Sequence, residues 1–558
     1  MKFIYSKHNL AGRDKALQRF FEILPGMISW TTLVGMTGLA FVKPLIAAIL
    51  IIAFNLYWFL RLIYMTIFLV LSYLRLKIEK KTNWMSRIAA IDKIFHFHNS
   101  SSANSEDIGK KPIFNSDYFF RKEIETLKKN HTPPPLSRDI YHLVIYPIIK
   151  ESREIVEPSI RSLSEQQFPS NRIILVLALE NRAPEIIKIE VKALADKYKN
   201  SFFDLLTITH PSDLPGEARV KGANVTFAAK AAAQYFKIKS IPSENIVVSC
   251  FDADTVVTPE YFACLTYNFM ITPNRTRSSF QPIPVYHNNI WDVPGFARVM
   301  DSGSSFFQLI EATNPEKLVT FSSHSMSFQA LAEIDYWPVD MISDDSAIFW
   351  KAYLHYDGEY QVIPIYVTLS MDIVAASNWW QTAKSIYKQK RRWAWGVENF
   401  PYLVVGVIKR PKIPLWKKFL YIERELEGKY FWATASIMIA VLGWLPLLLG
   451  GERFEEQVFA FNLPLLTRVI MQITTMFLIF SVYINMVLLP PRPAKYSRWR
   501  TANMILQWVF VPLVSTVFGS VPAIDAQTRL MLGKYMEFWV TPKARRTQIK
   551  EAAMIFSK

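Results

Sequence analysis

The chain has 558 residues, of which 51% are hydrophobic and 20% are charged, and its formal net charge is +17. This composition excludes a disordered chain, and the length exceeds what one core usually holds, so we expect several folding units. The two cysteines, Cys250 and Cys264, have no ligand-like spacing to histidines. This argues against a zinc site and a disulfide framework, and fits a reducing compartment.

Long apolar runs lie on both sides of a more polar middle. Two precede it, at 24–42 and 45–76, and two follow it, at 430–449 and 463–489. Each is long enough to cross a bilayer as a helix. Because the basic residues gather beside these runs, we expect them to face an anionic membrane or a phosphate-bearing substrate and predict no nucleic-acid partner.

Basic residues also predict the orientation, because they mark the cytoplasmic side of a span. They precede the first run and follow the second and fourth. We therefore expect an integral protein of the plasma or inner membrane with its middle in the cytoplasm. A fifth apolar run, 502–524, has basic residues on both sides, which predicts a re-entrant or interfacial hairpin; the alternative is an ordinary fifth span.

The predicted segments follow in this order: 1–23, a cytoplasmic N-terminal segment; 24–76, two transmembrane helices; 77–135, a cytoplasmic helix and linker; 136–395, an α/β domain; 396–427, interfacial helices; 428–490, two transmembrane helices; 491–525, a basic loop and the hairpin; 526–558, a cytoplasmic C-terminal segment. The segment 396–427 mixes apolar, aromatic and basic residues, which is typical of helices lying on a membrane surface. A plain connecting loop is the alternative.

The α/β domain is predicted from alternating strands and helices. We expect strands at 142–149, 172–179, 205–210 and 245–251, and helices at 151–167, 184–199 and 222–236. This alternation predicts a mostly parallel sheet with helices on both faces. Ligands of such sheets bind at the carboxyl ends of the strands.

Two acidic motifs follow in the domain. The strand 245–251 runs directly into Asp252-Ala253-Asp254, whose carboxylates can share Mg²⁺ or Mn²⁺ with a diphosphate; such a triplet alone is more often a solvated turn, and the buried strand before it favours the metal. Asp344 and Asp345 follow Ser343, and a carboxylate there can act as a general base. The alternative, which is compatible with the first, is that Ser343 caps a helix at 346–353.

A third motif is Gln389-Lys390-Arg391-Arg392-Trp393. Arginine can pair with a diphosphate, and tryptophan can stack against a sugar ring. A basic, aromatic helix on the membrane surface is equally compatible with these residues.

Taken in order, the three motifs resemble those of the family 2 glycosyltransferases, in particular the membrane-integrated branch of cellulose, chitin and hyaluronan synthases. The resemblance runs from about Tyr141 to Lys543. It implies a GT-A-like fold for 136–395, flanked by transmembrane helices, and a metal-dependent, inverting transfer of a sugar from a UDP- or GDP-sugar.

The resemblance also implies roles for single residues. The catalytic residues would be Asp345 and Asp344, and the metal ligands Asp254 and Asp252; the donor would contact Tyr146, Pro147, Glu151, Glu180, Lys221, Asp252, Gln389 and Arg392; the acceptor would contact Trp393, His324 and Ser325; a gating loop would hold Val540, Thr541, Pro542 and Lys543.

Four places depart from the family pattern, one of them Asp344, which replaces a glutamate. Lys150 replaces an asparagine, Glu180 stands where an aspartate usually contacts the nucleobase, and the segment around His324 differs from the common F-x-x-G-x-G. His324 would contact the diphosphate or the acceptor, or else be a hydrogen-bonded structural residue.

The predicted function is the transfer of sugars to a growing polysaccharide, coupled to export of the polymer, as the resemblance implies. Two alternatives stay open: transfer of one sugar to a membrane lipid, and a non-catalytic membrane binding protein with a transferase-like domain.

Overall fold

The chain divides into two units in the computed structural model, which describes residues 10–96, 116–129, 133–455 and 458–541. The sheet unit comprises Ser72–Asn288 and Glu311–Asp372. The helical unit comprises Met1–Leu71, Asn289–Ile310 and Ile373–Lys558.

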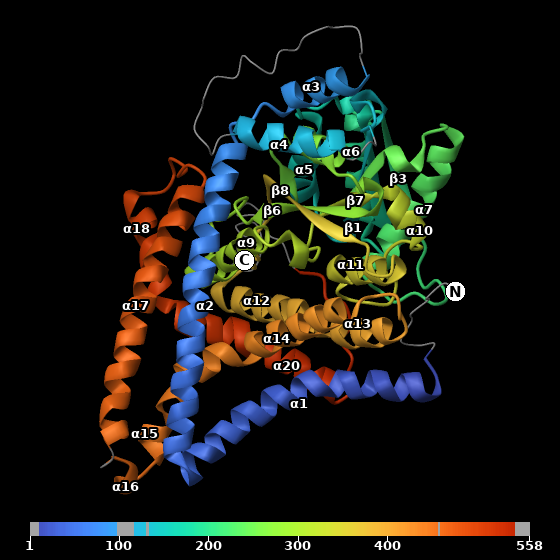
Figure 1. The fold of residues 1–558 in the computed structure, drawn as a ribbon. Coiled ribbons are helices and arrows are strands. Elements are labelled where there is room, and N and C mark those ends of the chain that lie inside the picture. The colour runs from blue at the N-terminus through green and yellow to red at the C-terminus, as the bar shows by residue number, and fades with distance from the viewer. Residues whose placement is uncertain (1–9, 97–115, 130–132, 456–457, 542–558) are drawn as a thin grey trace, which may run out of the picture. The chain divides into compact units, whose positions relative to one another are not determined.

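An eight-stranded sheet forms the core of the sheet unit, in the order β3-β2-β1-β4-β7-β6-β8-β5 (Figure 1). The strands are β1 Tyr141–Ile148, β2 Ile173–Glu180, β3 Asp204–His210, β4 Ile246–Cys250, β5 Val256–Val257, β6 Ser278–Val285, β7 Ser325–Ser327 and β8 Gln361–Ser370. Strands β3, β2, β1 and β4 run parallel, whereas β7 is antiparallel to both β4 and β6.

Helices pack around this sheet. They are α3 Trp84–His96, α4 Ser116–Lys129, α5 Arg153–Ser164, α6 Glu185–Tyr198, α7 Lys221–Ile238, α8 Tyr261–Ile271, α10 Phe328–Glu333 and α11 Asp344–His355. Helix α7 packs against β1, β2 and β3, and α8 packs against β8. The predicted α/β class is confirmed, and each of the four predicted strands ends within one residue of its expected position.

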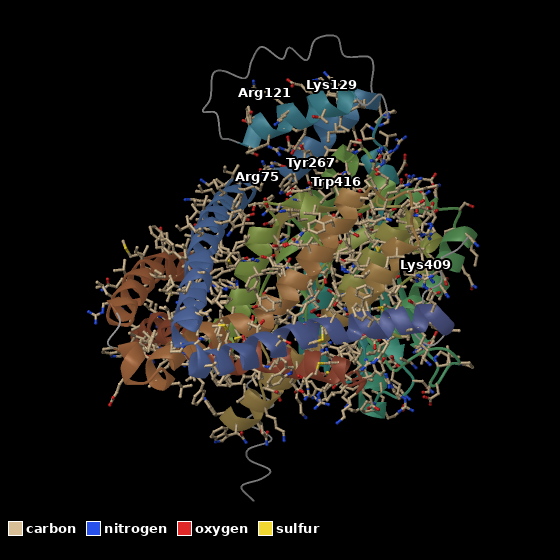
Figure 2. The ribbon with its side chains drawn as sticks, turned by 60° about the horizontal axis from the view of Figure 1, so that its bottom comes forward. Arg75, Arg121, Lys129, Tyr267, Lys409 and Trp416 are labelled. Carbon is tan, nitrogen blue, oxygen red and sulfur yellow. The ribbon has the colours of Figure 1, made fainter. Side chains whose placement is uncertain are left out.

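The C-terminal end of α2 (Pro44–Glu79) is held in the sheet unit by buried charges. The Glu79 carboxylate is 2.5 Å from the Arg75 guanidinium and 3.9 Å from that of Arg87. The Tyr267 hydroxyl of α8 donates to Glu123 of α4 at 2.5 Å. Figure 2 labels Arg75 and Tyr267 at this cluster, and Arg121 and Lys129 along α4. The ion pair with Arg87 joins α2 to α3, and the bond from Tyr267 joins α8 to α4.

The helical unit combines long and short helices. They are α1 Gly12–Val42, α2 up to Leu71, α9 Gly295–Glu311, α12 Trp379–Ala394, α13 Asn399–Ile408, α14 Leu415–Ala440, α15 Leu445–Leu449, α16 Glu452–Glu455, α17 Val458–Leu488, α18 Arg498–Leu506, α19 Val511–Ser515 and α20 Val521–Met531. Helix α1 packs against α13, α14 and α20 (Figure 1).

Three helices in the described part of the chain are long and apolar enough to cross a membrane. They are Gly12–Val42, Pro44–Glu79 and the helical run Arg498–Met531. A fourth span results if α14 and Leu442–Leu449, which are bent by 46°, are counted together. This bent pair contains the predicted span 430–449, and its break lies beside Gly443 and Pro446, residues that interrupt helices. The predicted span 463–489 lies almost wholly within α17.

The segment 502–524 differs from the predicted hairpin. A hairpin requires the chain to reverse, whereas the helical run Arg498–Met531 continues through this segment. Its irregular parts are a 3₁₀ turn at Gln507–Phe510 and a π turn at Thr516–Ser520, which lie around Pro512, Gly519 and Pro522. Proline lacks the N–H that a regular helix needs, which accounts for irregular turns within a continuous helical run.

The segment 396–427 combines a buried and an exposed helix. Every residue of α13 from Asn399 to Val407 is buried. The start of α14 instead exposes Leu415, Trp416 and Phe419 between lysines (Figure 2 labels Trp416). The start of α14 therefore has the exposed apolar side chains expected of an interfacial helix.

Candidate active site

Lys221, the first residue of α7, brings the two acidic motifs together. Its Nζ lies 2.8 Å from Oδ1 of Asp345, 3.1 Å from Oδ1 of Asp252 and 3.9 Å from Oδ2 of Asp344. Burial lowers the pKa of Lys221, but the neighbouring carboxylates, Asp252 first, outweigh it and hold this pKa well above its usual value. A permanent cation therefore lies between three carboxylates.

A glycine lets α7 approach the acidic helix α11 closely enough for these contacts. A Cβ atom on Gly222 would lie 2.1 Å from the Pro338 carbonyl oxygen and 3.4 Å from the Asp344 Cβ. The Thr226 hydroxyl donates to the Trp337 carbonyl at 3.1 Å, which holds the same segment. Sequence reasoning missed this role of Gly222, because a glycine inside a helix carries no signal about the segment that it meets.

The two aspartates of α11 have different surroundings. The Asp345 side chain is 27% exposed, and its Oδ2 makes no hydrogen bond within the described residues; the Asp344 side chain is 4% exposed. Asp345 is therefore the accessible carboxylate. Helix α11 begins at Asp344, so Ser343 occupies the predicted N-cap position, although its side chain makes no capping hydrogen bond. Both acids lie in the first turn, where the helix dipole favours them.

The D-x-D motif follows β4 and is held by a serine pair. The Ser322 hydroxyl donates to Oδ2 of Asp252 at 2.7 Å, and the Asp252 N–H donates to the Ser323 hydroxyl at 3.2 Å. Asp254 is buried, and its Oδ2 accepts from the Asp372 N–H at 2.8 Å. Ser323 has a φ of 59°, so the turn before β7 is shaped around Asp252. The sequence offers no signal for this support.

The carboxylates fit a metal ion only in part. In the described ranges, no three His, Cys, Asp or Glu side chains are placed to hold an ion. Asp252 and Asp254 supply the oxygen ligands that Mg²⁺ and Mn²⁺ accept, and such ions commonly take their remaining ligands from phosphates and water. The residues present therefore fit a divalent ion that arrives with a diphosphate.

Other predicted donor-binding residues at this edge support the backbone. The Tyr146 side chain is fully buried and its hydroxyl donates to the Thr255 carbonyl at 3.1 Å. Glu151 accepts from the N–H groups of Ile149 and Lys150 at 2.8 and 2.9 Å, and so closes the turn after β1. Pro147 is half-buried within β1. Their contacts with a donor stay predictions.

His324 and Ser325 are both buried. The His324 Nδ1 lies 3.0 Å from the Phe321 carbonyl and donates to it, while Nε2 is buried and without a hydrogen-bond partner in the described part of the chain. Burial lowers the pKa of His324, so its ring is neutral. The Ser325 hydroxyl lies 2.7 Å from that of Ser249, inside the sheet. Their acceptor-binding roles stay predictions.

The third motif lies on α12, in the helical unit. Gln389 is buried, and its Oε1 has no hydrogen-bond partner among the described residues. The Arg392 guanidinium lies 4.9 Å from the Phe538 ring centroid and 3.5 Å from the Thr541 hydroxyl. The structure therefore brings Arg392 to the start of the predicted gating loop, which includes Val540. Pro542 and Lys543 lie outside the described residues.

A closed ion pair lies beside this motif. Lys390 of α12 donates to Asp301 of α9 at 2.5 Å, and each side chain is 2% exposed. Burial lowers the pKa of Lys390 and raises that of Asp301. The Lys390 Nζ is also 3.6 Å from the Trp393 ring centroid. The pair therefore fixes the side of α12 that carries Gln389 and Trp393.

A comparison with protein families finds a match to the segment that contains these motifs. Residues 247–518 match the family described as glycosyl transferase family group 2. This stretch begins in β4 and contains Asp252, Asp254, Asp345, Gln389 and Arg392. This segment of the chain is therefore similar to the family 2 glycosyltransferases.

Solved structures with limited similarity are glycosyltransferases or proteins bound to a nucleotide sugar. The mannosyltransferase PcManGT from Pyrobaculum calidifontis, in complex with GDP-Man and Mn²⁺, is 13% identical with a TM-score of 0.39, over 81% of this chain and 100% of that one. S. aureus TarS 1-349 in complex with UDP-GlcNAc is 11% identical with a TM-score of 0.35, over 72% and 94%. The search of curated proteins found no match.

Proposed function

We propose that the protein is an inverting membrane glycosyltransferase that adds sugars from a nucleotide-sugar donor to a growing polysaccharide and couples this growth to export. The observation that carries the proposal is the open carboxylate of Asp345 beside Lys221 and Asp252, at the carboxyl end of a parallel strand. The family match over the same residues supports it. The catalytic domain would lie in the cytoplasm, where nucleotide sugars are found.

The chemistry follows from these side chains. Asp345 takes the proton of an acceptor hydroxyl, whose oxygen attacks the anomeric carbon while the bond to the diphosphate breaks, and the configuration inverts. The Lys221 ammonium offsets negative charge on the departing nucleoside diphosphate. A Mg²⁺ or Mn²⁺ ion on Asp254 and Asp252 would neutralise the same charge when bound. The resemblance assigns Gln389 and Arg392 to the donor and Trp393 to the acceptor.

A membrane lipid is the second candidate acceptor. The described residues contain three helices able to cross a membrane, or four with the bent pair, which is few for a polysaccharide channel. Such a transferase would add one sugar to the lipid and thread nothing through the membrane.

The test uses the full chain in nanodiscs with Mg²⁺ or Mn²⁺, supplied with UDP- and GDP-sugars and with glycan and lipid acceptors. We expect nucleoside diphosphate release that chelation abolishes and metal restores, with a long product. Asp345→Asn should lower the rate by about 10²- to 10⁴-fold, because the general base is lost. Asp335→Asn, at an exposed aspartate, is the matched control and should change little.

The products separate the candidates. A singly glycosylated lipid would replace the polysaccharide proposal with the second candidate. No release from any donor, or full activity of Asp345→Asn, would contradict the transferase mechanism.

A further inference from the structure

A partly buried lysine on the acidic helix α11 holds the turn that follows α10. The Lys351 Nζ donates to the main-chain carbonyls of Asp335 and Tyr336 at 2.9 and 2.8 Å. Both residues have left-handed backbone, with φ angles of 59° and 57°. This conformation costs free energy in residues other than glycine and persists only where other contacts hold it. Lys351 therefore fixes a strained turn against α11.

The three residues that come next, 337–339, contact the region around the start of α7 through their carbonyls. The first carbonyl accepts from the Thr226 hydroxyl at 3.1 Å, and a Cβ atom on Gly222 would lie 2.1 Å from the oxygen of the second. The third accepts from the N–H of Ala218, just before α7, at 2.9 Å. The turn that Lys351 holds therefore fixes the start of α7, where Lys221 lies.

These contacts lead back to α11 and to the proposed base. The turn joins α11 to α7, and Nζ of Lys221 lies 2.8 Å from Oδ1 of Asp345. Asp345 and Lys351 share α11 and are about 9 Å apart along the helix axis. A misplacement of about 1 Å can slow a reaction about 100-fold, so the rate should depend on the contacts that keep Lys221 and Asp345 in place.

We propose that Lys351 is a positioning residue: by holding the turn at 335–339 on α11, it sets the separation between the Lys221 ammonium and the Asp345 carboxylate. This inference rests on the proposed function, in which Lys221 meets the departing diphosphate and Asp345 takes the proton. Lys351 acts through the turn and α7, so it affects the rate without touching the substrate.

A second lysine contacts the same turn in a different way and provides the control. Lys230 of α7 lies 3.4 Å from the Asp335 carboxylate and 5.5 Å from the Tyr336 ring centroid. Its side chain is 52% exposed, and the carboxylate that it meets is 74% exposed. Exposed ion pairs contribute little to stability. Lys230 therefore touches side chains of the turn, whereas Lys351 holds its main chain.

The charge of Lys351 links this contact to pH. Burial lowers the pKa of Lys351 to about 8; Lys230 acts in the same direction, and Asp335 and Asp340 oppose it. A charged donor makes stronger hydrogen bonds than a neutral amine. Lys351 is protonated below about pH 8 and loses its charge as the pH rises through this value, so its hold on the turn should weaken in alkaline solution.

The first test measures turnover and nucleotide binding at pH 7 with the full chain in nanodiscs. Lys351→Met should lower kcat about 10- to 100-fold. It should leave the affinity for nucleoside diphosphate, measured by calorimetry, nearly unchanged, because Lys221, Asp252 and Asp254 are retained. Lys351→Arg keeps a cation that can bond both carbonyls and should keep most of the rate. Lys230→Met, the matched control, should change neither quantity.

Two further measurements separate positioning from a general loss of structure. The rate of the unchanged protein should fall above about pH 8, whereas Lys351→Arg, whose guanidinium stays charged, should keep its rate there. Hydrogen exchange needs no substrate. The N–H groups of Asp335 and Tyr336 donate to carbonyls of α10, and they should exchange faster in Lys351→Met but not in Lys230→Met.

The outcomes distinguish this inference from the function on which it rests. Full turnover of Lys351→Met, equal losses of turnover and nucleotide affinity, or unchanged exchange in the turn would overturn the positioning role and leave the transferase proposal standing. A fall above pH 8 that persists in Lys351→Arg would overturn the part played by the charge. No turnover of the unchanged protein with any donor would contradict the proposed function, while exchange would still show whether Lys351 holds the turn.

Discussion

The two units each contain a buried lysine, and the lysines have opposite surroundings. In the helical unit, Lys390 meets one carboxylate, Asp301, and both are sealed from water. In the sheet unit, Lys221 meets three carboxylates, and two of these, Asp252 and Asp345, remain about one-third exposed. The first pair is neutral and closed; the second cluster has a net negative charge and is open.

The difference separates a structural contact from a reactive one. In a buried ion pair such as Lys390 and Asp301, each charge is neutralised by the other and neither is accessible to a ligand, so the pair serves to hold helices together. An open cluster has charge and lone pairs left for a ligand, and it is held by contacts such as those of Ser322 that a ligand need not break. The comparison therefore predicts that the same substitution has different consequences in the two units.

The largest effect is expected from replacing each lysine by methionine. Lys390→Met leaves the Asp301 charge buried and unpaired, and should lower the stability of the protein by about 3–5 kcal/mol. Lys221→Met should cost on the order of 1 kcal/mol, because water reaches Asp252 and Asp345, but should weaken nucleoside diphosphate binding by roughly 10- to 100-fold. Unfolding midpoints and calorimetry in nanodiscs measure both. Equal destabilisation by the two variants would make Lys221 a structural residue.

A smaller effect is expected from separating α7 and α11. Gly222→Ala introduces a Cβ that meets the Pro338 carbonyl, so α7 must shift and carry Lys221 away from Asp345. We expect a loss of about 1–3 kcal/mol in stability and about 100-fold in transfer rate. Gly303→Ala is the control, because no heavy atom lies within 4 Å of its added Cβ. Unchanged turnover of Gly222→Ala would show that the site does not depend on this approach.

The smallest effect concerns a buried group that stays uncharged. His142 packs between Phe168 and Phe262 and bonds Thr266, and burial lowers its pKa to about 3. In the unfolded chain His142 is therefore protonated as the pH falls below about 6.5, whereas in the native state it stays neutral. Stability should be unaffected above this pH and fall by up to about 1.4 kcal/mol per pH unit as the pH decreases from about 6 towards 3.

His142→Phe, which retains the aromatic packing, should reduce this dependence. Unfolding midpoints of both proteins between pH 7.5 and 5 provide the comparison. Parallel curves for the two proteins would mean that His142 is protonated in the native state.

The sequence predicts the parallel half of the sheet and much less of the rest. Strand β2 is buried at all eight positions, so its apolar run is continuous and the sequence predicts where the strand begins and ends. Strands β5 and β7 have two and three residues, too few for a period, and their pairing depends on distant partners. The broken helix after Ala440 follows from Gly443 and Pro446, but its angle depends on packing that no local pattern contains.

The site shows the same division. The strand before Asp252 and the helix that begins at Asp344 are local signals, and they predict where carboxylates lie. The bond from Lys221 to Asp345 joins residues 124 positions apart. The close packing of α7 against α11 at Gly222 and the turn at Ser323 also depend on tertiary structure. The residue types alone therefore indicate the chemistry of the site but not the contacts that hold its side chains in place.

The pairing of Arg61 with Glu427 bears on how the chain enters a membrane. Arg61 lies within the apolar helix α2 and bonds Glu427 of α14, with Tyr57 donating to the same carboxylate at 2.6 Å. During synthesis at about 5–20 residues per second, Glu427 emerges roughly 20 to 70 seconds after Arg61. Placing a helix with an unpaired arginine in the hydrocarbon core of a bilayer costs free energy. If α2 crosses a membrane, we therefore expect Arg61 to rest at the lipid headgroups until α14 is synthesised, so that insertion of α2 is completed only late in translation.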